Sequence, residues 1–215
     1  MFSLCLCVLV LAACGDRNPG GTPAPAAEFS ATDQNLPKIV AFGNSLTAGL
    51  GLPESESYPA VLQKMLQADG YKYEVVNAGV SGDTTSGGLR RIDWSLEGNV
   101  KFVIVELGAN DILRGQPMDL MKKNLGEIIQ RARQRGAIVL LAGMEAPTNS
   151  GPEYRNEVHQ AFQALAKEHG VALIPFFLKD VVGAEKLIQA DGSHPNAEGA
   201  KVLAQTVYDA LKPLL

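Results

Sequence analysis

The chain has 215 residues, 46% of them hydrophobic, which is enough to bury the core of one domain of ordinary size. Its formal net charge at pH 7 is -4 and its isoelectric point is about 5.4. This composition excludes a nucleic-acid-binding protein, because the sequence has no basic stripe that would neutralise phosphate groups.

The amino-terminal segment is apolar and uncharged from residue 2 to residue 13, and it is too short to span a bilayer as a helix. This pattern is typical of the apolar region of a signal peptide, although no Lys or Arg precedes it as one normally does. All three cysteines, Cys5, Cys7 and Cys14, lie in or directly after this segment. Cysteine catalysis, a disulfide and a cysteine metal site are therefore excluded from the remainder of the chain.

The end of this segment, Leu11-Ala12-Ala13-Cys14-Gly15, resembles the bacterial lipobox, whose cysteine becomes the lipidated first residue of the mature protein. Acyl chains on that cysteine would anchor the protein to a membrane. The residues that follow are rich in Pro, Gly, Ala, Thr and Ser, as in a flexible tether. We therefore expect an exported bacterial protein with a signal peptide at 1–13, a lipidated cysteine and tether at 14–37, and a globular domain at 38–215. In the alternative, an ordinary cleaved signal peptide would leave the protein free in the periplasm.

From residue 38 onward, short apolar runs alternate with helix-like segments, which is the pattern of a parallel α/β sheet. Five of these runs are predicted strands, at 39–42, 73–77, 101–107, 137–142 and 171–175. Helices on both faces and right-handed crossovers make the flavodoxin-like order 2-1-3-4-5 the simplest arrangement, a three-layer α/β/α domain. In that order the loops after the first and third strands meet at one crevice, where such sheets bind ligands.

Four stretches carry apolar residues at helical spacing, and each is predicted to face the sheet. Ser57 is the expected N-cap of the first, and Gly170 ends the third. We interpret the methionines and aromatic residues in these stripes as core residues rather than ligands. The stripes begin at Tyr58, Met118, Tyr154 and Ala200.

A serine follows the first predicted strand in the sequence Gly43-Asn44-Ser45-Leu46. A hydroxyl at this strand end points into the ligand crevice, so Ser45 is a candidate nucleophile. A serine before a helix can also be only a cap, and this motif alone leaves both interpretations open.

Only His194, of the three histidines, lies in a loop, between Asp191-Gly192-Ser193 and Pro195-Asn196. Asp191 is close enough in the chain to hold the Nδ1 proton of His194, which leaves Nε2 free to act as a base for a serine. In the alternative, the Asp191 side chain only closes an Asx-turn. His159 and His169 fall on a predicted helix, and we interpret them as structural or solvated.

Three groups are candidate donors for an oxyanion. Gly82, in the sequence Val80-Ser81-Gly82-Asp83 after the second strand, offers an unobstructed backbone N–H near a helix start. Asn110 offers a side-chain amide, and the N–H of Ser45 is the third donor.

Four blocks in order resemble the GDSL (SGNH) hydrolase family. They begin at Phe42, Asn77, Gly108 and Asp191, and the match spans about residues 38 to 212. The resemblance implies that Ser45, Gly82, Asn110 and His194 are the residues for which the family is named, with Asp191 as the acid of the triad. It also implies catalysis without a metal or an organic cofactor, and we expect a monomer.

Within that family, the loop after Asn110 resembles the bacterial thioesterase I, lysophospholipase and arylesterase group. The resemblance implies hydrolysis of carboxylic esters, among them aryl esters and lysophospholipids, and of acyl thioesters. It further implies that acyl selectivity is shaped by Ile112, Leu113, Arg114, Gly115, Gln116 and Pro117.

The family has an aspartate where this chain has Asn44, so one negative charge beside the nucleophile is missing. The amide is nearly isosteric and still accepts one hydrogen bond, and we expect Asn44→Asp to change activity less than about tenfold. Two other functions remain open: a carbohydrate O-acetyl esterase or acetyl transferase of the cell envelope, and a surface-anchored binding lipoprotein with a degenerate site.

Overall fold

The computed structural model describes residues 36–215. The predicted signal peptide, the predicted lipidation residue Cys14 and all but the last two residues of the predicted tether lie outside the described residues. Among the described residues, no helix combines the length and the apolar character that crossing a membrane requires.

Five parallel strands form one sheet in the order β2-β1-β3-β4-β5, which confirms the predicted order. The predicted strand bounds are correct to within two residues at each end. The strands are β1 (Lys38–Gly43), β2 (Glu74–Gly79), β3 (Val100–Glu106), β4 (Ile138–Ala142) and β5 (Ala172–Ile174). At the carboxyl end of β1, Gly43 pairs with Gly79 of β2 and with Glu106 of β3. The loops that follow these three strands therefore leave one edge of the sheet together.

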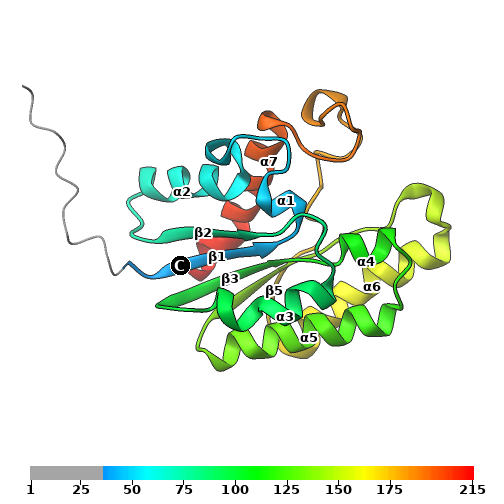
Figure 1. Cartoon of the computed structure of the whole chain (residues 1–215), viewed down its shortest axis with the longest axis horizontal. Coiled ribbons are helices and arrows are strands. Elements are labelled where there is room, and N and C mark those ends of the chain that lie inside the picture. The colour runs from blue at the N-terminus through cyan, green and yellow to red at the C-terminus, as the bar shows by residue number, and fades with distance from the viewer. Residues whose placement is uncertain (1–35) are drawn as a thin grey trace, which may run out of the picture. The chain divides into compact units, whose positions relative to one another are not determined.

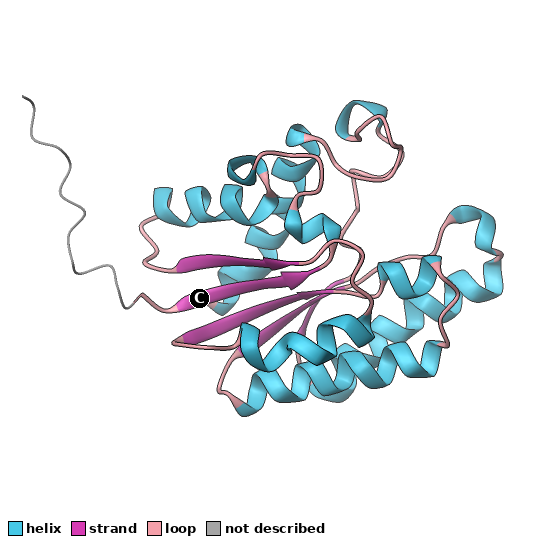
Figure 2. Cartoon of the chain, in the orientation of Figure 1, coloured by secondary structure: helices cyan, strands magenta, loops and turns pink. Residues whose placement is uncertain are grey.

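Helices cover both faces of the sheet, as the three-layer prediction requires. In Figure 1, α2 and α7 lie on one face, and α3, α5 and α6 lie on the other, while Figure 2 shows the strands between these two layers. The helices are α1 (Ser45–Ala48), α2 (Tyr58–Ala68), α3 (Thr85–Ser95), α4 (Ala109–Leu113), α5 (Met118–Gln134), α6 (Pro152–His169) and α7 (Ala197–Leu211). Short 3-10 turns lie at Glu54–Glu56, Thr148–Ser150, Glu185–Leu187 and Lys212–Leu214.

The four predicted apolar stripes lie on α2, α5, α6 and α7, and they pack into the core. Met121 and Phe162 are buried, which confirms their interpretation as core residues. Ser57 occupies the predicted N-cap position of α2, but it makes no side-chain capping bond. Its hydroxyl instead donates to the carbonyl of Glu54, because the 3-10 turn just before α2 places that acceptor 2.7 Å away.

Only the start of α3 was apparent from the sequence, because glycines stand where an apolar stripe would be expected. A Cβ at Gly88 would lie 2.3 Å from Leu107 and 3.2 Å from the ring of Phe42. A Cβ at Gly87 would lie 2.3 Å from Asp83. Gly88 therefore lets α3 approach the sheet closely, and Gly87 makes room for the side chain of Asp83 in the preceding loop. Together they conceal the helical period of α3 in the sequence.

Candidate active site

Ser45 is the first residue of α1, and only Asn44 separates it from the end of strand β1. The side chain of Asn44 caps this helix, since its Oδ1 accepts a hydrogen bond of 3.0 Å from the N–H of Leu46. The helix ends after one turn at Gly49, whose φ of 74° favours glycine. The serine is therefore held on a short turn at the edge of the sheet, and its cap is the preceding residue.

His194 connects this serine to Asp191. The Nε2 atom of His194 lies 2.9 Å from the Oγ of Ser45, although the two residues are 149 positions apart. Its Nδ1 atom lies 2.6 Å from Oδ2 of Asp191. These contacts follow the arrangement of nucleophile, base and orienting acid that activates a serine hydroxyl.

Asp191 fulfils both of the roles considered for it from the sequence. Its Oδ1 accepts from the N–H groups of Ser193 and His194, at 2.9 and 3.0 Å, which closes an Asx-turn, while Oδ2 contacts the imidazole. These backbone hydrogen bonds, together with that of the His194 ring, lower the pKa of Asp191 to about 2. The carboxylate is therefore ionised at the pH at which His194 must hold a proton on Nδ1.

Gln189 joins the loop of His194 to the loop that follows Ser45. Its side-chain nitrogen donates to the carbonyl of Leu50 at 2.7 Å and to that of Pro195 at 2.9 Å. Gly51 makes this approach possible, because a Cβ there would lie 2.2 Å from Oε1 of Gln189. This contact could not be predicted from the sequence, since Gln189 and Leu50 lie 139 positions apart.

The three expected oxyanion donors lie in the segments that follow β1, β2 and β3 at the carboxyl edge of the sheet, Ser45 in α1, Gly82 in a turn and Asn110 in α4. In the described part of the chain, the N–H groups of Ser45 and Gly82 donate no hydrogen bond. Asn110 uses one amide hydrogen to donate to the carbonyl of Asp83 at 2.9 Å, which orients the amide and leaves its second hydrogen available. Gly82 is the third residue of a turn closed by the bond from Asp83 N–H to the Val80 carbonyl, and its φ of 84° requires glycine.

Arg91 of α3 fixes the loop that carries Gly82 to the strand ends. Its guanidinium donates to Asp83 at 2.7 Å and to the carbonyls of Ala78 and Gly43, each at 2.8 Å. One side chain therefore connects the ends of β1 and β2 to the loop that carries Gly82. Sequence analysis missed Arg91 because it lies on the helix whose extent was not apparent.

The predicted acyl-selectivity segment falls into two parts. Ile112 belongs to α4 and is buried, so its side chain is packed into the core rather than presented at the surface. The residues from Leu113 to Pro117 are exposed, and Arg114 donates to the carbonyl of Gly82 at 3.1 Å. The exposed part of this segment therefore contacts the loop that carries Gly82.

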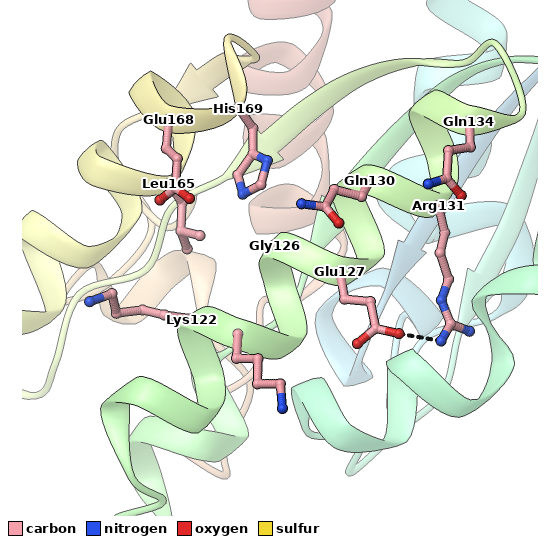
Figure 3. A pocket seen from close by; sticks show the side chains of 10 residues that line it. Lys122, Gly126, Glu127, Gln130, Arg131, Gln134, Leu165, Glu168 and His169 are labelled. Carbon is pink, nitrogen blue, oxygen red and sulfur yellow. Dashed lines mark hydrogen bonds and ion pairs between the residues drawn. The ribbon is translucent and has the colours of Figure 1, made fainter.

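A small pocket of about 10 Å³ lies beside Ser45 and His194, with Leu46, Leu50 and Leu52 among its lining residues. A larger groove, of about 540 Å³, lies between α5 and the end of α6, and Figure 3 shows the side chains that line it. Its lining carries charges of both signs, including the ion pair of Glu127 with Arg131, and it contains none of the predicted site residues. His169 lies in this groove, whereas His159 contacts Gln163 on the same helix.

Comparison with known proteins finds esterases and a thioesterase among the similar proteins. A model of the GDSL-like lipase/acylhydrolase family matches residues 41–202. Esterase TesA of Pseudomonas aeruginosa is 43% identical over 178 residues, which are 82% of this chain and 89% of that protein. The thioesterase 1/protease 1/lysophospholipase L1 of Escherichia coli K12 is 35% identical over 178 residues, 82% of this chain and 84% of that protein. The crystal structure of a psychrotrophic esterase, EstA from a Pseudoalteromonas species, inhibited by monoethylphosphonate, superposes with a TM-score of 0.78 at 32% identity, covering 82% of this chain and 97% of that one.

Proposed function

Because the chain belongs to the GDSL-like lipase/acylhydrolase family and is a serine hydrolase of the esterase type, we propose that Ser45, His194 and Asp191 are its catalytic triad. The observation that carries the proposal is the chain of contacts from Ser45 Oγ through His194 to Asp191, at 2.9 and 2.6 Å. Each contact lies within the distance at which a proton can pass to the base or be held by the acid.

In the proposed mechanism, His194 Nε2 removes the proton of Ser45 as its oxygen attacks the ester carbonyl. The N–H groups of Ser45 and Gly82 and the free amide hydrogen of Asn110 stabilise the oxyanion that forms. His194 then protonates the leaving alcohol, and the acyl-enzyme remains. Water, deprotonated by the same histidine, releases the acid and restores the serine. The protein's own residues supply each proton transfer.

Carboxylic esters with an apolar acyl group are the proposed substrates, among them aryl esters and lysophospholipids, together with acyl thioesters. The names of similar proteins, among them an esterase, an arylesterase and a thioesterase/lysophospholipase, support this range. The exposed Leu113, which directly precedes the Arg114 that contacts Gly82, is also consistent with apolar acyl groups. We propose that the exposed segment from Leu113 to Pro117 shapes acyl selectivity.

Export and membrane attachment are proposed from the amino-terminal sequence. The apolar segment at 1–13 would direct export, and lipidated Cys14 would attach the domain at 38–215 to a membrane through the segment at 14–37. Labelling of cells with a palmitate analogue tests this arrangement. The wild type is expected to incorporate the label and Cys14→Ala to lose it, whereas equal labelling of both would contradict lipidation at Cys14.

A panel of substrates tests the proposed activity: nitrophenyl esters of short and long acyl chains, acyl thioesters and acetylated sugars. We expect turnover of the esters by the wild type and its loss in Ser45→Ala. Ser81→Ala is a matched control, because Ser81 is an exposed serine in the loop next to Gly82. Turnover confined to the acetylated sugars would instead favour the carbohydrate esterase, and tight ligand binding without turnover would favour the binding lipoprotein.

A further inference from the structure

A carboxyl group that the proposed mechanism does not use lies directly beneath the turn of Ser45. Glu106, the last residue of β3, is fully buried. Its Oε1 accepts from Nδ2 of Asn44 at 2.9 Å, and its Oε2 accepts from the N–H of Asn44 at 3.2 Å and from the hydroxyl of Thr47 at 2.7 Å. All three donors therefore belong to the two residues that flank Ser45 and Leu46.

The direction of these hydrogen bonds is set by a backbone group that can only donate. The N–H of Leu46 donates to the side chain of Asn44, so the amide oxygen must face Leu46. The amide nitrogen then faces Glu106, which must accept. Asn44 is thus more than a neutral replacement for an acidic acceptor, because it supplies a donor to a second acid that the sequence did not reveal.

The carboxyl group of Glu106 also explains why a glycine is required at position 43. A Cβ at position 43 would lie 2.5 Å from Oε2 of Glu106 and 2.1 Å from the hydroxyl of Thr47. No left-handed backbone is involved, so the glycine is required by the close approach alone. Three residues of the motif, Gly43, Asn44 and Thr47, therefore converge on Glu106.

We propose that Glu106 is a positioning residue for the nucleophile Ser45. In this proposal positions 44 and 106 act as one hydrogen-bonded unit, which requires one carboxylate and one amide side chain. Glu106 touches no reacting atom, but it holds the turn whose serine attacks the substrate. The proposal rests on the proposed role of Ser45 as the nucleophile.

Charge and hydrogen bonding explain why one acid and one amide suit this site. Burial raises the pKa of Glu106 to about 7, and the hydrogen bonds from Thr47 and Asn44 oppose that effect. A second carboxyl at position 44 would face it at hydrogen-bond distance, and the two would share one proton. Two amides are unsuitable for a different reason, because an N–H would face another N–H whichever way the amides were turned.

Exchange of the two side chains tests the unit. We would measure kcat and KM for an aryl ester at about pH 8, where Glu106 is mostly ionised, in Glu106→Gln, Asn44→Asp and the double variant. The number of active sites would be taken from titration with a fluorophosphonate. Glu106→Gln is expected to lower kcat by about 10²-fold with little change in KM, as for a nucleophile misplaced by about 1 Å. Asn44→Asp is expected to stay within about tenfold of the wild type, since the shared proton replaces an amide hydrogen.

The double variant is the decisive member of the set, because it restores one acid and one amide in exchanged positions. We expect its kcat to recover to within about tenfold of the wild type, a rescue that a merely structural role would not produce. A double variant no better than Glu106→Gln would overturn the proposal. Tyr208→Phe is the control, because Tyr208 lies near the carboxyl end of α7, away from His194, and the substitution removes only its hydroxyl contact to Asp69. It should leave kcat unchanged.

Two further measurements cover the cases in which Glu106→Gln does not fold or Ser45 is not the nucleophile. If Glu106→Gln does not fold, Asn44→Asp alone tests the unit, because raising the pH from about 8 to about 10 removes the shared proton. Its kcat should then fall at least tenfold relative to the wild type, and parallel profiles would contradict the proposal. A wild type that the fluorophosphonate does not label at Ser45 would instead contradict the proposed function.

Discussion

Replacement of Gly43 by alanine adds one methyl group at the point where β1 meets the nucleophile turn. The new Cβ would lie 2.1 Å from the hydroxyl of Thr47, 2.5 Å from Oε2 of Glu106 and 2.8 Å from the backbone carbonyl of Glu106. The side chains of Thr47 and Glu106 are already hydrogen-bonded to each other at 2.7 Å, and the carbonyl of Glu106 cannot move unless β3 moves with it. Relief of these contacts to an ordinary separation therefore requires a movement of about 1 Å in the turn that carries Ser45.

The size of that movement fixes the expected magnitudes. A displacement of about 1 Å at a reacting group lowers the rate by about 10²-fold, so kcat should fall by that factor while KM changes little. Overpacking of a core by one methyl group costs about 1–3 kcal/mol of unfolding free energy. In a domain of this size each kcal/mol lowers the melting temperature by about 2–4 °C.

The assay combines kcat per titrated active site with thermal unfolding. Gly126→Ala is the matched control, because Gly126 lies within α5 and its close neighbours are side chains. A Cβ there would lie 3.0 Å from the ring of His169, which can turn aside, and 3.9 Å from Leu165, which is an ordinary contact. This control should keep the wild-type kcat and gain up to about 1 kcal/mol from helix propensity. Gly43→Ala with wild-type kcat and melting temperature would refute the reasoning.

Four further predictions concern individual contacts. Asp191→Asn should lower kcat by about 10⁴-fold without loss of folding, and a loss under tenfold would contradict its role in orienting the base. Asn110→Ala should lower kcat by about 10²- to 10³-fold, which steady-state kinetics would check against an unchanged KM. Gln189→Ala should lower kcat without preventing slow labelling of Ser45 by a fluorophosphonate, because only the tie between two loops is lost. The free energy of unfolding, measured with a denaturant, should fall as the pH rises from about 4.5 to about 7. In this range Glu106 of the native protein, which faces Tyr58 of α2 and Thr47, keeps a proton that the unfolded chain has lost. Glu106→Gln should remove this contribution to the pH dependence of stability.

The fold was predictable because its signals are local. Each strand is a short apolar run closed by turn residues, and the order of the strands then follows from chirality and connection rules. The contacts of Ser45, Asp191 and His194 were also anticipated, since each lies in a loop that this order brings to one edge. α3 was less apparent, because its glycines serve close packing and remove the apolar period on which the prediction depends.

The supporting residues could not be predicted, because their partners are distant in the chain. Glu106 ends an apolar run, and nothing in Val105-Glu106-Leu107 indicates that the carboxyl turns inward to Asn44, 62 positions away. Arg91 and Gln189 likewise act through backbone carbonyls, which have no signature in the sequence. The tertiary structure alone brings these acceptors within reach.

The central claim is that Ser45 is the nucleophile of this hydrolase, and mass mapping of a covalent adduct tests it most directly. The protein would be treated with a fluorophosphonate, digested and analysed for the modified residue. We predict one phosphonyl group per chain, located on Ser45 and absent from Ser45→Ala. An adduct on Ser81, or labelling that persists in Ser45→Ala, would contradict the account.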